Sequence, residues 1–94
     1  MPRYLVQRVF DDMDDDELTE LAARSKRIGK EQFPQITWEH SHVVSDGDGN
    51  TISFCVYDAP DPQAIYEHAT ELGRHQVSNV FEIGGDISPS DFPS

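Results

Sequence analysis

The side chains best suited to chemistry gather in one stretch, residues 36–59. It reads ITWEHSHVV, then SDGDGN, then TISFCVYDA. His40 and His42 lie two positions apart in the first run, and the chain's only cysteine, Cys55, lies in the last. Imidazole and thiolate suit nickel, copper or zinc and do not suit magnesium or calcium. We therefore take His40, His42 and Cys55 as candidate ligands of a divalent transition metal.

The local pattern that would position these donors is an antiparallel hairpin. Both runs are rich in β-branched and aromatic residues, and the join consists of turn residues. With residues 45–50 as the loop, the expected facing pairs are Val44 with Thr51, Ser41 with Phe54, His40 with Cys55 and Trp38 with Tyr57. Facing residues have Cβ atoms about 4.5–5.5 Å apart, close enough for His40 and Cys55 to share one ion. A slip of one residue would move these side chains to the other face.

Alternation along the two strands gives the hairpin two unlike faces. One would carry Trp38, His40, His42, Ser53, Cys55 and Tyr57, and the other Glu39, Ser41, Val43, Ile52, Phe54 and Val56. The second set can cover a core. We therefore expect the second set beneath helices and the first set on an open face.

The flanking segments predict a single small domain. Residues 3–10 alternate as a strand, residues 11–16 form an acidic helix start, and Pro34 ends that helix. Asp61 and Pro62 are expected to begin a second helix, and residues 77–83 to form a last strand. The order β-α-β-β-α-β predicts a ferredoxin-like α+β fold, with two helices on one face of a four-stranded antiparallel sheet. We expect a domain over residues 1–84 and a Gly/Ser/Pro-rich tail over residues 85–94.

The composition disfavours two classes of binding partner. Seven basic against eighteen acidic residues give a formal net charge of −11, which disfavours nucleic acid and anionic membranes. No run approaches the ~20 apolar residues of a spanning helix, and nothing resembles a signal peptide, so a reducing cytoplasm is expected. The core is thin and the open face aromatic, which favours a homodimer in the form of a dimeric α+β barrel.

Two runs in this stretch carry a family resemblance. Residues 37–43, TWEHSHV, resemble a TW-x-HS-x-V motif, and residues 54–65 resemble FCVY-x-APDP-x-AI. Both motifs are typical of a family of small bacterial proteins whose best-described type is a nickel-binding protein with a dimeric ferredoxin-like fold. The resemblance extends from residue 3 to about residue 83 and implies this fold and nickel as cofactor. His42 departs from the pattern, which has an aromatic residue such as tyrosine there, and the tail is unlike the short family ending.

Other interpretations remain open. Cys55 could be a small buried hydrophobe, with the histidines hydrogen-bonded at a dimer interface. The chain could instead be an enzyme resembling the cofactor-free monooxygenases and cyclases, with a small-molecule substrate held between sheet and helices by Trp38, His40, Tyr57 and His68. A calcium loop at residues 46–57 is disfavoured, because Thr51 replaces the required glycine and Tyr57 the closing glutamate.

Overall fold

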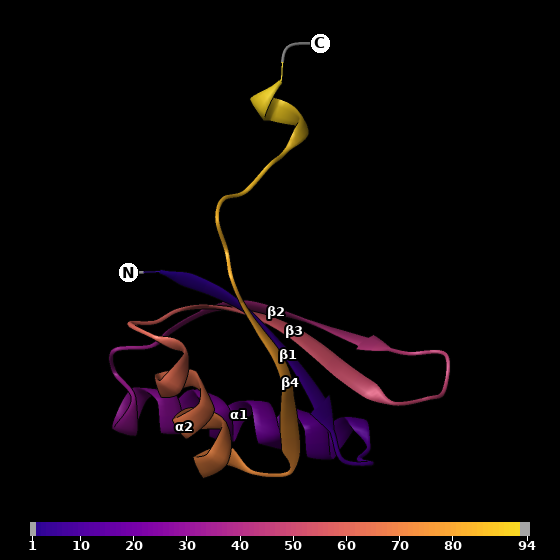
Figure 1. The fold of residues 1–94 in the computed structure, drawn as a ribbon. Coiled ribbons are helices and arrows are strands. Elements are labelled where there is room, and N and C mark those ends of the chain that lie inside the picture. The colour runs from indigo at the N-terminus through magenta and orange to yellow at the C-terminus, as the bar shows by residue number, and fades with distance from the viewer. Residues whose placement is uncertain (1, 93–94) are drawn as a thin grey trace.

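The chain folds into one antiparallel sheet covered on one face by two helices (Figure 1). The structure is a computed structural model that describes residues 2–92. In chain order its elements are β1 (Arg3–Phe10), α1 (Asp15–Gln32), β2 (Thr37–Ser45), β3 (Thr51–Asp58), α2 (Pro62–Leu72), β4 (His75–Glu82) and a short 3-10 helix, η1 (Pro89–Asp91). The strands lie in the order β2-β3-β1-β4. The predicted ferredoxin-like α+β fold is confirmed.

An aspartate caps the N-terminus of each long helix. The Asp14 carboxylate accepts a hydrogen bond from the Glu17 N–H, and the Glu17 side chain accepts one from the Asp14 N–H. At α2 the Asp61 carboxylate accepts from the Ala64 N–H at 2.9 Å. These contacts satisfy N–H groups that have no partner within the helix, which explains why the helices begin here.

The register between β2 and β3 differs from the expected one over most of the hairpin. Ser45 faces Thr51, Ser41 faces Cys55 and His40 faces Val56, whereas Trp38 faces Tyr57 as predicted. The shift occurs between Trp38 and His40, where Glu39 is an extra residue, a β-bulge. The expected pairing of His40 with Cys55 is therefore wrong.

Two local interactions account for this register. In the loop, the Asp46 carboxylate accepts from the N–H groups of Asp48 and Asn50, both at 2.9 Å, which closes a turn one residue tighter than expected. In the bulge, the Glu39 carboxylate pairs with the Arg3 guanidinium, with Nε and Oε2 2.8 Å apart. A tighter loop and an extra strand residue compensate for each other, so the register at Trp38 is the predicted one.

The two faces of β3 are the reverse of what we expected. Ser53, Cys55 and Tyr57 are buried beneath the helices, in a core that also contains Tyr4, Val6 and Ile65. Ile52, Phe54 and Val56 lie on the other side, called here the open face. The prediction placed the more apolar set against the helices, but both faces of this sheet are apolar, so hydrophobicity alone does not distinguish them. Polar atoms fit the core because they find partners there, as between Tyr57 Oη and Arg8.

Beyond β4 the chain leaves the sheet and extends away from the domain (Figure 1). Ile87 and Phe92 are 82% and 62% exposed. Where this segment leaves the domain, the Asp86 carboxylate pairs with the Arg3 guanidinium at 2.7 Å. The division into a domain over residues 1–84 and a tail over residues 85–94 stays a prediction, and its residues 1, 93 and 94 lie outside the described part. Within residues 2–92, no helix has the length and hydropathy required to cross a membrane.

Candidate functional site

Two of the three candidate metal ligands lie together on the open face. His40 and His42 face Val56 and Phe54 on β3, so both imidazoles project away from the helices. Their ring centroids are 5.5 Å apart and the rings meet edge to face. Both side chains are exposed. Each neutral imidazole has a nitrogen lone pair available for a metal ion.

The third candidate, Cys55, lies on the opposite side of the sheet. Its thiol is 5% exposed and lies 3.2 Å from Ser53 Oγ, beneath the helices. A single chain therefore does not bring Cys55 to His40 and His42. Nowhere in residues 2–92 do three His, Cys, Asp or Glu side chains converge as a metal site would require.

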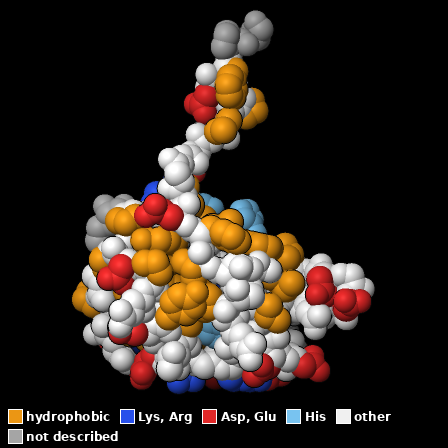
Figure 2. Space-filling model, in the orientation of Figure 1, with side chains coloured by type: hydrophobic (Ala, Val, Ile, Leu, Met, Phe, Trp, Pro, Cys, Tyr) orange, Lys and Arg blue, Asp and Glu red, His pale blue; other side chains and the backbone are white. Residues whose placement is uncertain are grey.

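The open face also carries exposed apolar side chains. Phe81 faces Leu5 across β4 and β1, on the open face, and is 51% exposed. Val44, near the hairpin turn, is another exposed hydrophobic side chain of this face. In the view of Figure 2, hydrophobic side chains gather at the surface of the domain. Exposed apolar side chains on an uncovered face of a sheet are typical of a protein interface.

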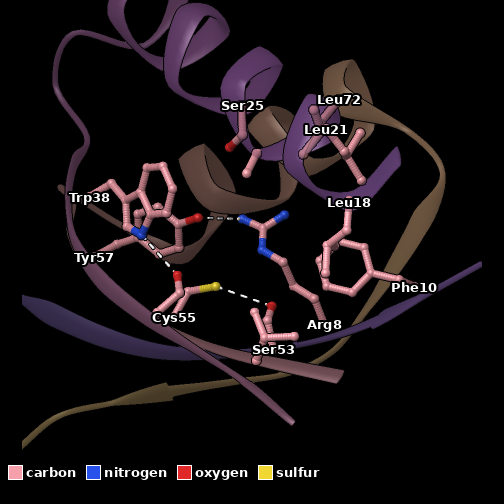
Figure 3. Close-up of a pocket in the computed structure, with 13 residues that line it drawn as sticks. Arg8, Phe10, Leu18, Leu21, Ser25, Trp38, Ser53, Cys55, Tyr57 and Leu72 are labelled. Atoms are coloured by element: carbon pink, nitrogen blue, oxygen red, sulfur yellow. Dashed lines mark hydrogen bonds between the residues drawn. The ribbon is translucent and has the colours of Figure 1, made fainter. Parts of the chain in front are cut away.

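On the helix side of the sheet lies a cavity of about 90 Å³, which we call the Arg8 pocket (Figure 3). Apolar side chains from β1, α1 and α2 form part of its wall, namely Phe10, Leu18, Leu21 and Leu72. The β2–β3 hairpin contributes Trp38, Cys55 and Tyr57. The Arg8 guanidinium extends among these side chains and is the only charged group that lines the pocket within the described residues (Figure 3).

Arg8 is held by two neutral partners. Its Nη2 donates to Tyr57 Oη at 3.2 Å, and its carbon Cζ lies 5.4 Å from the centre of the Tyr57 ring. Its Nη1 donates to Nε2 of His75. The other nitrogen of that ring, Nδ1, donates to the Gly73 carbonyl at 2.7 Å, which leaves Nε2 free to accept from Arg8.

Burial keeps the groups around Arg8 uncharged. Loss of water raises the pKa of Tyr57 to about 12, and the nearby Arg8 charge only partly opposes this. Burial also lowers the pKa of His75, with a further lowering from the Arg8 charge, although the hydrogen bond to Gly73 opposes it. The Arg8 charge is therefore not neutralised by either of its hydrogen-bond partners.

A second, larger hollow of about 400 Å³ adjoins the Arg8 pocket and shares Ser25, Trp38 and Tyr57 with it. His68 lines this hollow, and its Nε2 contacts the Ser25 carbonyl oxygen at 3.3 Å. Three of the four residues expected for an enzyme substrate, Trp38, Tyr57 and His68, thus lie together, whereas His40 is on the open face.

Arg8 is the residue that sequence reasoning missed. It occupies a helix-facing position in the alternation Tyr4, Val6, Arg8, and it is 2% exposed. The available signal was an arginine in the apolar pattern of a central strand. That signal does not show that Arg8 is buried in a pocket, because its partners there, Tyr57 and His75, come from two other strands.

Comparisons with known proteins agree with this architecture. The family described as nickel responsive protein SCO4226-like matches residues 4–83. The solution structure of the C-terminal domain of MgtC from Mycobacterium tuberculosis is similar at a TM-score of 0.57 and 18% identity, over 90% of this chain and 88% of that one. A mutant of SnoaB, a cofactor-independent oxygenase from Streptomyces nogalater, is similar at a TM-score of 0.53 and 16% identity, over 92% of this chain and 96% of that one. At these identities the two structures show a shared fold alone. A comparison with curated proteins found no match.

Proposed function

Because the chain belongs to the family of nickel responsive proteins of the SCO4226-like type, we propose that it binds nickel and is not an enzyme. We infer that His40 and His42 on the open face are the donors of each chain. The observation that carries this proposal is the pair of exposed imidazoles, 5.5 Å apart on one strand. Imidazole nitrogen is a ligand type that suits nickel.

The donor set of one chain is incomplete, which links metal binding to a second copy. Two imidazoles leave most positions of a nickel ion to other ligands, and Glu39 is already engaged by Arg3. In a two-fold dimer the same surface of both subunits meets, so a second pair of histidines can complete the site. The exposed apolar side chains of the open face, such as Phe81, support such a dimer.

Cys55 has no part in this proposed site. Because a reducing compartment keeps a lone thiol free, we infer a cytoplasmic location. In this compartment the protein would buffer nickel or respond to it.

The test is a calorimetric titration with nickel chloride on the native protein and on three variants. His40→Ala and His42→Ala should each weaken binding by about tenfold or more, because each removes a ligand. Cys55→Ser is the matched control and should bind as the native protein does. Affinity should also fall as the solution is acidified, since a protonated imidazole cannot coordinate.

Two outcomes would contradict the proposal. Equal binding by the native protein and both histidine variants would mean that nickel binds elsewhere. Absence of binding by the native protein would remove the metal function and leave the histidines as interface residues.

A further inference from the structure

We propose that the Arg8 pocket is a binding site for a small monocarboxylate with a short apolar chain. The acid group would pair with the Arg8 guanidinium, and the hydrocarbon part would lie against Leu18, Leu21 and Leu72. The site is on the opposite side of the sheet from His40 and His42, so this inference does not depend on nickel binding.

The first argument is an uncompensated charge. Arg8 is 2% exposed, yet no carboxylate in residues 2–92 forms an ion pair with it. The arginines that do form ion pairs in this part of the chain, Arg3 and Arg74, lie at the surface. A buried charge without a partner of opposite sign is costly, typically by several kcal/mol in free energy of folding. The neutral partners Tyr57 and His75 relieve only part of this cost. An anion that enters the pocket would relieve much of the rest.

The second argument is an unused donor. The Nε atom of Arg8 is buried and has no hydrogen-bond partner in the described structure. A guanidinium presents its N–H groups as a planar fork that matches the two oxygens of a carboxylate. Nη1 and Nη2 each carry two N–H groups and donate one of them, to His75 and Tyr57, so a second N–H remains beside the unpartnered Nε–H for a two-oxygen ligand.

The third argument concerns size and polarity. A closed cavity of about 150 Å³ can hold benzene, which has six non-hydrogen atoms. The Arg8 pocket is smaller, about 90 Å³, but partly open to solvent, so it suits the carboxylate and first carbons of an acid of about two to four carbons, and the end of a longer chain can extend through the opening. The hydroxyls that line the pocket beside the guanidinium already contact other side chains, which leaves few donors for phosphate or sulfate; they belong to Ser25, Ser41 and Ser53. The apolar wall of the pocket favours a hydrocarbon chain over a hydrated inorganic ion.

The experiment uses butyrate as the probe and butyramide as its uncharged counterpart of the same shape. In nitrogen-15 NMR spectra of the native protein, butyrate should produce a saturable shift of the Arg8 Nε–H signal and of the Trp38 indole signal. Butyramide should produce no comparable shift. Butyrate should also raise the thermal midpoint of unfolding, because it binds only the folded state.

Variants test whether butyrate binding depends on the Arg8 charge. Arg8→Met keeps an unbranched side chain and should weaken butyrate binding by about tenfold or more, as expected when a charge-assisted hydrogen bond is lost. The double variant with His40→Ala and His42→Ala should bind butyrate as the native protein does. If Arg8→Met does not fold, the comparison of butyrate with butyramide on the native protein still decides the matter.

Four results would overturn the proposal. These are no saturable binding of butyrate, equal binding of butyramide, equal binding of chloride or inorganic phosphate at the Arg8 signal, and unchanged butyrate binding by folded Arg8→Met.

Discussion

Trp38 and His40 lie two residues apart on one strand and yet project from opposite faces of the sheet. Trp38 faces Tyr57 and lines the Arg8 pocket, whereas His40 faces Val56 on the open face. In a regular strand, residues two apart share a face, and the bulge at Glu39 breaks that rule. One edge strand thereby contributes side chains both to the proposed nickel site and to the proposed carboxylate site.

We expect the protein to be a homodimer that buries its open face. Sedimentation equilibrium should give about twice the chain mass of 10.6 kDa. Phe81→Asp should shift the mass toward a single chain, because it would bury an unpaired charge in the interface. Tyr66→Asp, at an exposed hydrophobic side chain of α2, is the control and should leave the dimer intact. A single-chain mass for the native protein would contradict this expectation.

The start of α2 should depend on the Asp61 side chain. Asp61→Ala should lower the free energy of unfolding by about 1 kcal/mol, because the Ala64 N–H loses its acceptor. Asp61→Asn retains an oxygen in the same place and should restore most of the loss. Urea denaturation measures both, and an unchanged midpoint for Asp61→Ala would show that another group caps the helix.

The end of α2 should require glycine. Gly73 has φ +73° and ψ −175°, a conformation that residues with a Cβ rarely adopt. Gly73→Ala should lower the free energy of unfolding by about 1–3 kcal/mol through backbone strain alone, since no atom beyond the two adjacent residues lies within 4 Å of the added methyl group. Gly47→Ala, in the hairpin loop with equally open surroundings and no positive φ, should change it little. Equal urea midpoints for the two variants would refute the strain argument.

Stability should decline in mildly acidic solution. Burial lowers the pKa of His68 and His75 in the folded protein, and the Arg8 charge lowers both further. In the unfolded chain both titrate near 6.5. As the pH falls through 6.5 toward the lower folded values, the unfolded state therefore binds more protons and the free energy of unfolding decreases. Above about pH 6.5 this contribution is fully present.

Urea denaturation at fixed protein concentration across this pH range measures the slope. Replacing His68 and His75 together with glutamine should flatten it, whatever the change in absolute stability. Replacing either histidine alone with glutamine should give an intermediate slope. An undiminished slope in the first variant would assign the acid sensitivity to other groups.

Much of the fold could be predicted because its signals are local. The Asp61–Pro62 helix start and the alternation of Tyr4 and Val6 each depend on a few neighbouring residues. The hairpin register could not be predicted in full, since it depends on a hydrogen-bonded loop at Asp46 and on the ion pair of Glu39 with Arg3, a residue 36 positions away.

The candidate site illustrates the same limit. His40 and His42 share a face because no bulge lies between them, and this does not depend on the register of β2 against β3. Their expected meeting with Cys55 required the correct register. The Arg8 pocket could not be predicted, because an arginine in a strand is normally exposed. Only the folded sheet brings Tyr57 and His75 to Arg8.

The position of Cys55 makes its thiol a probe of how often the domain opens. It is the chain's only cysteine and lines the Arg8 pocket, so a thiol-reactive dye can attach at a single, known place. Because the thiol is 5% exposed, the dye must wait until the helices part from the sheet. The time course of labelling therefore records how often the domain opens, and a ligand that holds the pocket closed would be visible as a slower reaction.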